Sequence, residues 1–259
     1  MTNYPRLVAF DLDDTLAPSK SPLDPRMAAL MLRLLDVAEV CVISGGQLAQ
    51  FRMQVVDTLE GATDAQLERL HLMPTCGTQY YRFSDGGLAQ VYAQSLSDHE
   101  KSRALAAVER AARELGYWES DIWGPILEDR DSQITFSALG QAAPVSAKMA
   151  WDPAGEKKNR LRAAVQALLP DLEVRSGGST SVDITRRGID KAYGMTQLAE
   201  LTGVPLGDML FVGDRLDPDG NDYPVKALGV ACHSVRDWQD TAGYLETLIP
   251  ALLATPAQA

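Results

Sequence analysis

The chain has 259 residues, enough for one large domain or two modest ones, and its 46% hydrophobic and 23% charged residues are typical of soluble globular proteins. The net charge of −11 argues against a nucleic acid or an anionic membrane as a partner, because either would repel the surface. Three scattered cysteines are too few for a disulfide scaffold or a zinc site.

The first part of the chain alternates predicted strands and helices. Residues 7–10 form a short apolar run that stops at a carboxylate cluster, as a buried strand does when it ends at a site. A helix follows over 24–35, with Asp24 as its N-cap, and a second buried strand over 40–43 precedes a helix around 48–59. This alternation predicts a parallel, doubly wound sheet.

The pattern changes near Tyr80. Two extended runs, 80–83 and 88–92, flank Ser-Asp-Gly-Gly, which is typical of a β-hairpin. The segment that follows combines helices and strands, predicted over 98–115, 127–139, 155–169, 172–175 and 181–184. Hairpins mixed with two helices indicate an antiparallel sheet that is covered on one side.

The strand–helix alternation then resumes, with helices over 190–201 and 238–253 and strands over 208–212 and 229–232. We therefore predict an α/β protein with a discontinuous core. Residues 1–84 and 188–259 would form a doubly wound, parallel-sheet, Rossmann-like catalytic core, and residues 85–187 an inserted α+β cap domain.

Polar residues follow three of the predicted buried strands: Asp11 and Asp13, then Ser44 and Gly45, then Asp214. Because the carboxyl ends of parallel strands line one crevice, we expect these residues to converge. Several carboxylates in one crevice are unfavourable unless a hard cation neutralises them. Ligands that are all oxygen select Mg²⁺ over zinc.

Asp11 and Asp13 are two carboxylates separated by one residue, and we expect their side chains to diverge and to take different roles. We predict that Asp11 attacks phosphorus and binds the metal. Asp13 would then give a proton to the leaving oxygen and later take one from the incoming nucleophile. The alternative is an acidic turn, in which Asp14 and Thr15 cap the next segment of the chain.

Residues 10–16, Phe-Asp-Leu-Asp-Asp-Thr-Leu, resemble the first signature of the haloacid dehalogenase-like phosphotransferases and hydrolases. Ser44 is similar to the hydroxyl of the second motif, Lys191 to the lysine of the third, and Asp214 with Asp222 to the acidic fourth motif. This resemblance implies that Ser44 donates a hydrogen bond to the phosphoryl oxygens and that Lys191 neutralises their charge. Lys191 alone would more often be a solvated surface lysine.

The implied cofactor is Mg²⁺, and its expected ligands are Asp11, Asp13, Asp214 and Asp222. Asp222 would be either a ligand or a group that orients the ligands.

Within this superfamily the chain resembles the eukaryotic-type phosphomannomutases of capped subfamily IIB. The resemblance rests on residues 177–184, 188–191, 213–222 and, more weakly, 128–130. It implies that Arg130, Ser181 and Asp183 contact the sugar or its phosphate. The alternative for Ser181 and Asp183 is the polar side of a half-solvated strand.

The chain departs from the phosphomannomutase pattern at three arginine positions, which hold Lys20, Gln141 and Lys148. An amide cannot form a charged fork onto a phosphate, and a lysine binds as a point charge. The distal phosphate site is therefore weakened, which favours water as the phosphoryl acceptor. The expected substrate-binding residues are Lys20, Gly45, Arg130, Gln141, Lys148, Ser181 and Asp183.

We hypothesise a Mg²⁺-dependent phosphosugar phosphatase that forms an aspartyl-phosphate on Asp11, with Asp13 as general acid and base. The alternative is a phosphomannomutase-like hexose phosphomutase that uses a sugar bisphosphate. A non-catalytic sugar-phosphate sensor ranks lower, because the catalytic carboxylates and Lys191 are all present.

The expected partner is a small phosphorylated sugar, and the inserted domain would close over it as a lid. The resemblance also implies a homodimer that forms through the cap. The N-terminus lacks a signal-like apolar stretch and no run is long enough to span a bilayer, so we predict a cytoplasmic protein.

Overall fold

The computed structural model describes residues 4–177 and 180–254; Gly178 and Ser179, within the predicted return from the insertion, lie outside this range. The described residues form two compact units. The first extends to Ala93 and resumes at Asp190, and the second comprises Gln94–Ile189. We call them the core unit and the inserted unit.

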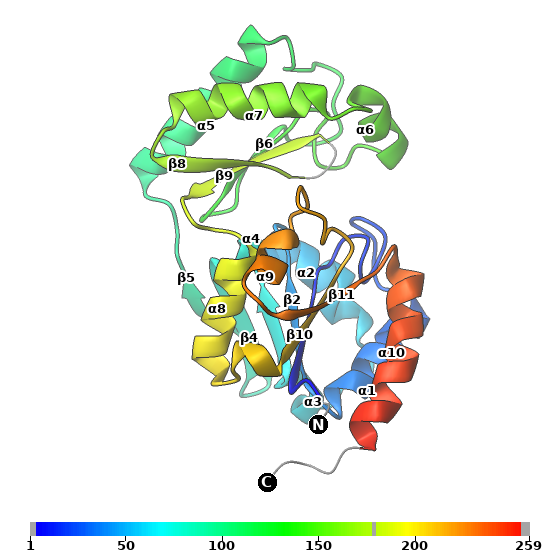
Figure 1. Cartoon of the computed structure of the whole chain (residues 1–259). Helices are drawn as coiled ribbons and strands as arrows, with labels where there is room; N and C mark the ends of the chain where they lie inside the picture. The colour runs from blue at the N-terminus through cyan, green and yellow to red at the C-terminus, as the bar shows by residue number, and fades with distance from the viewer. Residues whose placement is uncertain (1–3, 178–179, 255–259) are drawn as a thin grey trace. The chain divides into compact units, whose positions relative to one another are not determined.

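The core unit is a seven-stranded sheet with helices on both faces (Figure 1). Its strands are β1 (Leu7–Phe10), β2 (Glu39–Ile43), β3 (Leu70–Met73), β4 (Gln79–Ser84), β5 (Gly87–Ala93), β10 (Met209–Gly213) and β11 (Ala231–Ser234). Its helices are α1 (Pro25–Leu35), α2 (Leu48–Gln54), α3 (Asp64–Leu67), α4 (Pro74–Gly77), α8 (Lys191–Thr202), α9 (Tyr223–Ala227) and α10 (Trp238–Leu253), with 3₁₀ turns at Val56–Thr58 and Leu206–Asp208.

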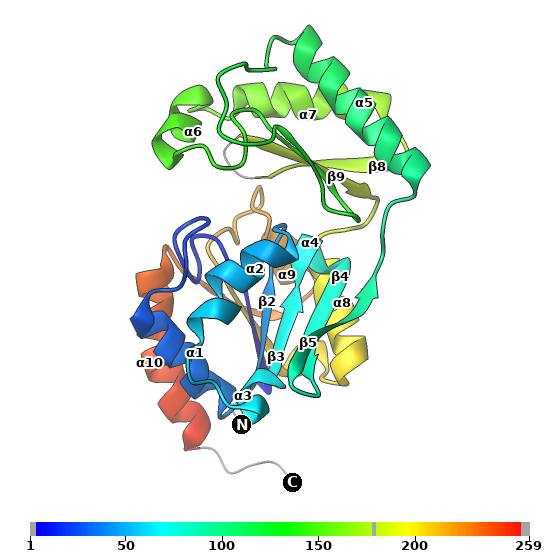
Figure 2. The ribbon, with the colours of Figure 1, turned by 180° about the vertical axis from the view of Figure 1, so that it is seen from behind.

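The strand order is β11-β10-β1-β2-β3-β4-β5, and the pairs from β11 to β3 are parallel. Successive side chains of a strand point to opposite faces of the sheet, so alternate residues pack into two different hydrophobic cores, one on each face. In β1, Val8 and Phe10 pack with α1 and α10, whereas Leu7 and Ala9 pack with α8 and α9. Figure 2 shows the same two layers from behind. The predicted doubly wound α/β fold is confirmed.

The hairpin of β4 and β5 continues the core sheet. Tyr80 of β4 lies opposite Tyr92 of β5, and His71 of β3 lies opposite Arg82 of β4. The core unit therefore extends to Ala93, whereas the prediction ended it before residue 85. The change from parallel to antiparallel pairing occurs within the core sheet and does not mark the start of the inserted unit.

The sequence prediction also omitted β3, whose four residues are all buried. Its polar member, His71, hydrogen-bonds to Tyr80 Oη at 2.7 Å and to Glu39 Oε2 at 2.8 Å. These partners satisfy both ring nitrogens, so a histidine fits in a buried strand there.

The inserted unit is an antiparallel four-stranded sheet in the order β6-β7-β9-β8. Its elements are α5 (Asp98–Glu114), β6 (Leu127–Asp129), β7 (Ile134–Ser137), α6 (Val145–Trp151), α7 (Glu156–Leu168), β8 (Leu172–Ser176) and β9 (Ser181–Arg186). Ile134, Phe136, Val182 and Ile184 form a core with α5 and α7. The alternate residues of β7 and β9 are polar, so this sheet is covered by helices on one side, as predicted.

Among the described helices, none combines the length and the apolar character needed to cross a membrane.

The loop after β3 packs closely against α8 at a pair of glycines, and this contact yields a stability prediction. Gly77 and Gly86 both have a positive φ (83° and 76°), so an alanine at either position costs about 1 kcal/mol of backbone strain. A Cβ on Gly77 would lie 2.5 Å from Gly194 Cα, whereas a Cβ on Gly86 would meet nothing within 4 Å. Gly77→Ala should therefore lose about 1–3 kcal/mol more than Gly86→Ala in urea unfolding. Equal losses would contradict this packing argument.

Candidate active site

Three neighbouring parallel strands bring their carboxyl ends to one edge of the core sheet. Asp11 follows β1, Ser44 follows β2 and Asp214 follows β10, and β1 pairs with both other strands. The Asp11 N–H donates to the Val212 carbonyl at 3.0 Å, so the β1–β10 ladder continues into the site. The topology thus brings together the residues that the strand-end pattern predicts.

Lys191 enters this edge from the first turn of α8. Asp190 caps the helix by accepting a hydrogen bond from Tyr193 N at 3.0 Å. The Lys191 side chain is 1% exposed, and its Nζ lies 2.5 Å from Asp11 Oδ1 and 2.5 Å from Asp222 Oδ1. One ammonium group therefore links two buried carboxylates.

The loop after β10 returns Asp222 to the site. Arg215 N donates to Asp222 Oδ2 at 3.1 Å, and the Asp222 side chain is fully buried. Within the loop, Asp217 builds a turn: its Oδ1 accepts from Asp219 N at 3.2 Å and its carbonyl accepts from Gly220 N at 2.8 Å.

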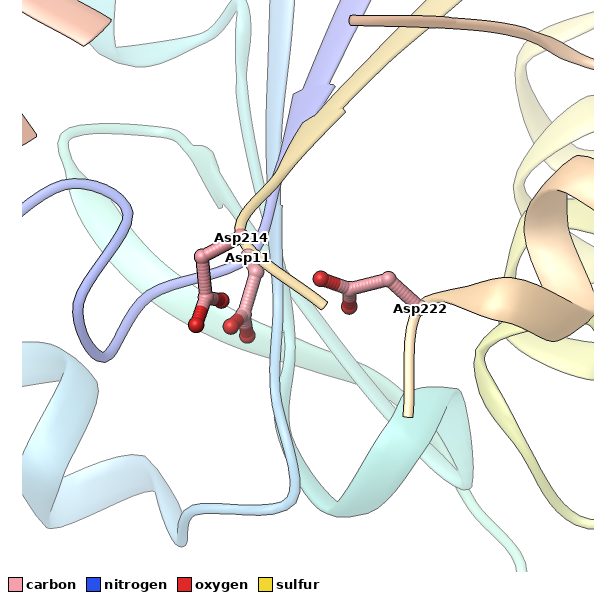
Figure 3. A group of neighbouring side chains, drawn as sticks. All are labelled: Asp11, Asp214 and Asp222. Atoms are coloured by element: carbon pink, nitrogen blue, oxygen red, sulfur yellow. The ribbon is translucent and has the colours of Figure 1, made fainter. Parts of the chain in front are cut away.

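Asp11, Asp214 and Asp222 form an acidic cluster in which one carboxylate oxygen of each lies within 4.8 Å of the others (Figure 3). Burial raises the pKa of Asp11 well above its usual value, although the charge of Lys191 opposes this. Burial, and next the charge of Asp222, raise the pKa of Asp214.

The charge of Lys191 compensates only part of this cluster. Its burial disfavours the ammonium form, but Asp11 and Asp222 outweigh burial and raise its pKa. A single positive charge then faces three carboxylates. A site with only oxygen ligands and excess negative charge suits a hard divalent cation.

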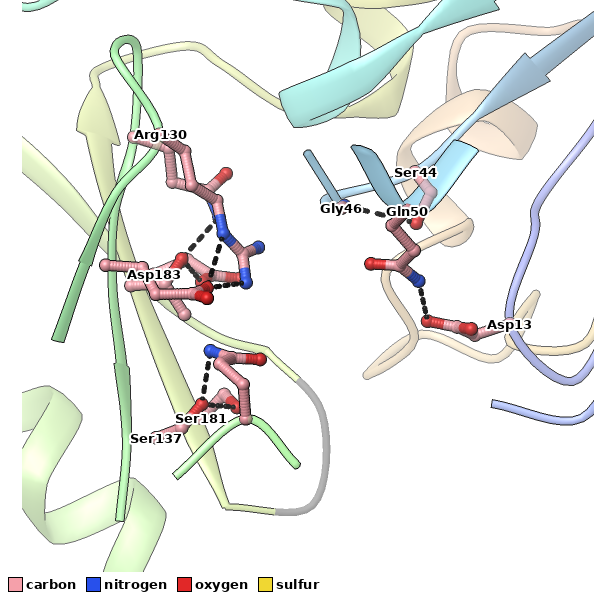
Figure 4. A network of polar contacts seen from close by, with 12 residues as sticks. Asp13, Ser44, Gly46, Gln50, Arg130, Ser137, Ser181 and Asp183 are labelled. Carbon is pink, nitrogen blue, oxygen red and sulfur yellow. Dashed lines mark hydrogen bonds and ion pairs between the residues drawn. The ribbon is translucent and has the colours of Figure 1, made fainter. Parts of the chain in front are cut away.

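Asp13 lies outside the acidic cluster and has its own set of donors. Lys20 N donates to its Oδ1 at 2.8 Å, and Gln50 Nε2 donates to its Oδ2 at 3.0 Å (Figure 4). Asp11 and Asp13 therefore have different surroundings. The role of Asp13 as a metal ligand stays a prediction.

Ser44 belongs to the loop between β2 and α2. Ser44 is 7% exposed, and its Oγ accepts from Gly46 N at 3.4 Å. Gly45 lies between these two residues in the same loop.

The backbone of Lys20 is left-handed, with φ 57°, and its N–H is turned toward Asp13.

The predicted residues of the inserted unit gather on the polar side of its sheet. Thr135 lies opposite Asp183 and donates to its Oδ1 at 2.7 Å. Ser137 lies opposite Ser181, and their hydroxyl oxygens are 2.9 Å apart (Figure 4). Burial raises the pKa of Asp183, although the charge of Arg130 opposes it.

Arg130, Gln141 and Lys148 join this polar group. Arg130 forms an ion pair with Glu128 at 2.6 Å, and the Arg130 side chain is 8% exposed. Gln141 Nε2 donates to Ser137 Oγ at 2.8 Å, and Lys148 Nζ donates to the Gln141 carbonyl at 3.2 Å.

The structure adds residues that the motifs do not single out: Gln50, Gln54, Glu128, Thr135 and Ser137. Gln50 and Gln54 lie four residues apart in the helix after Ser44, so the spacing places them on one helix face but does not indicate that this face contacts Asp13. Strand alternation opposite Ser181 and Asp183 was the signal for Thr135 and Ser137.

Known proteins resemble this chain in sequence and in fold. A family model described as haloacid dehalogenase-like hydrolase matches residues 139–224. Phosphomannomutase 1 of Homo sapiens is 24% identical over 251 residues, which cover 91% of this chain and 88% of that protein. The phosphomannomutase of Schizosaccharomyces pombe is 25% identical over 261 residues, which cover 93% of each chain.

Among solved structures, the N-terminally truncated, IMP-bound IMP-nucleotidase of Plasmodium falciparum superposes with a TM-score of 0.73 at 12% identity. The match covers 96% of this chain and 69% of that chain, and it shows a shared fold. Together these similarities confirm the resemblance that the sequence motifs predict.

The buried ion pairs of Lys191 yield a second stability prediction. Lys191→Met leaves Asp11 and Asp222 buried without their cation, so it should lower the free energy of unfolding by about 3–5 kcal/mol at pH 8 with EDTA present. Arg26 is the matched control, because its pair with Glu246 is 48% and 47% exposed and Arg26→Met should cost no more than about 1 kcal/mol. Similar losses in the free energy of unfolding for the two variants, measured by urea unfolding, would show that the buried pairs stabilise the fold no more than an exposed pair does.

Proposed function

We propose that this chain, a haloacid dehalogenase-like enzyme of the phosphatase and phosphotransferase class, is a Mg²⁺-dependent phosphatase of a phosphorylated sugar. The phosphoryl group would pass first to Asp11 and then to water. The arrangement of Asp11, Asp13, Lys191 and the acidic cluster supports this two-step chemistry.

In the first step an oxygen of Asp11 attacks phosphorus and the ester P–O bond breaks. Asp13 gives its proton to the leaving sugar oxygen, and an aspartyl-phosphate remains on Asp11. In the second step water attacks phosphorus while Asp13 takes a proton from it. The bond between phosphorus and Asp11 breaks, which releases inorganic phosphate and restores the Asp11 carboxylate.

Lys191 and Ser44 would support both steps. The ammonium group of Lys191, 2.5 Å from Asp11, holds this carboxylate in place and adds positive charge beside the transferring group. Ser44, at the end of β2, would donate its hydroxyl to a phosphoryl oxygen. A Mg²⁺ ion held by Asp11, Asp214 and Asp222 would supply the positive charge that allows an anionic carboxylate to approach an anionic phosphate.

The observation that favours water as the acceptor is the neutral side chain of Gln141. A mutase must hold the second phosphate of a sugar bisphosphate, and arginine forks are the strong donors for this purpose. Gln141 instead carries no charge and donates to Ser137 Oγ at 2.8 Å. The side-chain amide is thus engaged within the sheet of the inserted unit. This arrangement supports a sugar monophosphate as substrate.

The second candidate is a hexose phosphomutase, and the observation that favours it is the similarity to phosphomannomutases over more than nine-tenths of the chain. The first half-reaction at Asp11 would be the same. The second would deliver the phosphoryl group to another sugar hydroxyl. For this candidate we also propose a homodimer that forms through the inserted unit.

The proposed function predicts catalytic release of inorganic phosphate. Purified protein with Mg²⁺ should release phosphate from mannose-1-phosphate over many turnovers, and Asp11→Asn should reduce the rate by at least about a hundredfold because the nucleophile is lost. Release can be followed by a colorimetric phosphate assay, with circular dichroism as the check that Asp11→Asn is folded. Conversion to mannose-6-phosphate that depends on a hexose bisphosphate, without release of phosphate, would support the mutase instead.

Metal binding gives a separate prediction. Mg²⁺ should bind in a calorimetric titration, and Asp214→Asn should raise its dissociation constant by at least about tenfold, since it replaces a charged carboxylate ligand by a neutral amide but leaves the Lys191 ion pairs intact. Asp217→Asn is the matched control, because Asp217 belongs to the same loop but lies outside the acidic cluster, where it builds the turn and pairs with the exposed side chain of Arg215. Equal weakening in both variants, or in neither, would argue against the acidic cluster as the metal site.

A further inference from the structure

Two glutamines of α2 reach the Asp13 carboxylate from the same side of the helix. Gln50 Nε2 lies 3.0 Å from Asp13 Oδ2, and Gln54 Nε2 lies 3.3 Å from Asp13 Oδ1. Residues four apart lie on one helix face, so this pair can hold both oxygens of one carboxylate. Figure 4 shows the contact between Gln50 and Asp13.

Gln54 has a fixed orientation. Its side chain is completely buried, and its Nε2 also donates to the Ser21 carbonyl at 2.8 Å. Rotating the amide by half a turn would place Oε1 against two oxygens, which repel it. The observed orientation is therefore determined by two acceptors, of which one is Asp13.

The same orientation leaves Gln54 Oε1 buried without a hydrogen-bond partner among the described residues. Buried polar atoms are rarely left unsatisfied, and the exceptions concentrate where function needs a particular geometry. Methionine has a similar shape and would avoid the unsatisfied oxygen. A glutamine at this position is explained by the two acceptors that its amide group serves, the Ser21 carbonyl and Asp13 Oδ1.

The two oxygens of Asp13 differ in their surroundings. Oδ1 accepts from the backbone N–H of Lys20 at 2.8 Å and from the completely buried side chain of Gln54, so a main-chain group and a buried amide anchor it. Oδ2 accepts from Gln50, which is only half-buried, whereas Gln54 is completely buried. Oδ2 is thus the oxygen that can exchange its partner for a reacting oxygen.

We propose that Gln54 is a positioning residue that anchors Asp13 through Oδ1, so that Oδ2 is presented for proton transfer. Gln50 holds Oδ2 until a leaving group or water replaces it. This inference rests on the proposed function, in which Asp13 gives a proton to the leaving oxygen and takes one from water. Its basis is the geometry of the donors around Asp13.

The test compares two phosphate esters that differ in their need for a proton. The sugar oxygen of mannose-1-phosphate must be protonated as it leaves, whereas the phenolate of p-nitrophenyl phosphate leaves without help. Gln54→Met should lower kcat/KM for mannose-1-phosphate by about 10- to 100-fold, because a misplaced acid no longer reaches the leaving oxygen. The value for p-nitrophenyl phosphate should change by less than about threefold.

Two further variants make the result decisive. Gln47→Met places the same substitution at the exposed start of α2, where the side chain makes no capping hydrogen bond, and should change neither value. Asp13→Asn should show the same dependence on the leaving group as Gln54→Met, but more strongly.

A parallel loss on both esters in Gln54→Met would indicate a purely structural role and overturn the inference, as would no loss on either. If Asp13→Asn itself shows no dependence on the leaving group, the acid–base role in the proposed function falls, and the inference falls with it. If only Gln54→Met lacks the dependence, the proposed function stands and the positioning role is rejected. Failure of the wild-type chain to hydrolyse either ester contradicts both.

Discussion

The ammonium group of Lys191, buried between the carboxylates of Asp11 and Asp222, is the interaction on which the site depends. It joins three segments that are far apart in the sequence: the end of β1, the start of α8 and the loop after β10. Such an arrangement is stable only when each charge keeps its partner, because an unpaired buried charge is strongly destabilising. The close contact of Gly77 with Gly194 lets α8 approach the sheet closely enough to deliver this lysine.

The proposed phosphoryl transfer depends on the different surroundings of two carboxylates, Asp11 and Asp13, that are two residues apart in the sequence. Asp11 faces Lys191 and the acidic cluster, whereas Asp13 faces neutral amide donors from α2 and one backbone N–H. A nucleophile beside a cation and an acid–base group held by neutral donors are the two components that phosphoryl transfer through an aspartyl-phosphate requires. Strand alternation does not explain this separation, because residues two apart in a strand share a face. The separation arises beyond the end of β1 at Phe10, where Asp11 contacts Lys191 and Asp13 contacts α2.

The residues at the strand ends could be predicted from sequence because buried parallel strands have a clear apolar pattern and their ends share one edge. The extent of the sheet could not, since β3 is short and contains His71, and since the turn before β5 marks a hairpin without indicating which sheet it joins. Gln54 could not be assigned either. A glutamine in a helix has no characteristic spacing to a carboxylate about 40 residues earlier, and only the fold brings them within 3.3 Å.

The central claim is that Asp11 becomes covalently phosphorylated. The most direct measurement is a rapid acid quench of the enzyme during turnover of p-nitrophenyl phosphate with Mg²⁺, followed by proteolysis and mass spectrometry of the peptide that contains residues 7–16. The account predicts a phosphoryl group on Asp11 that is absent in Asp11→Asn and accumulates in Asp13→Asn, where water attack is slowed. A phosphoryl group on another residue, or turnover with no phosphorylated peptide in either the wild-type chain or Asp13→Asn, would contradict it.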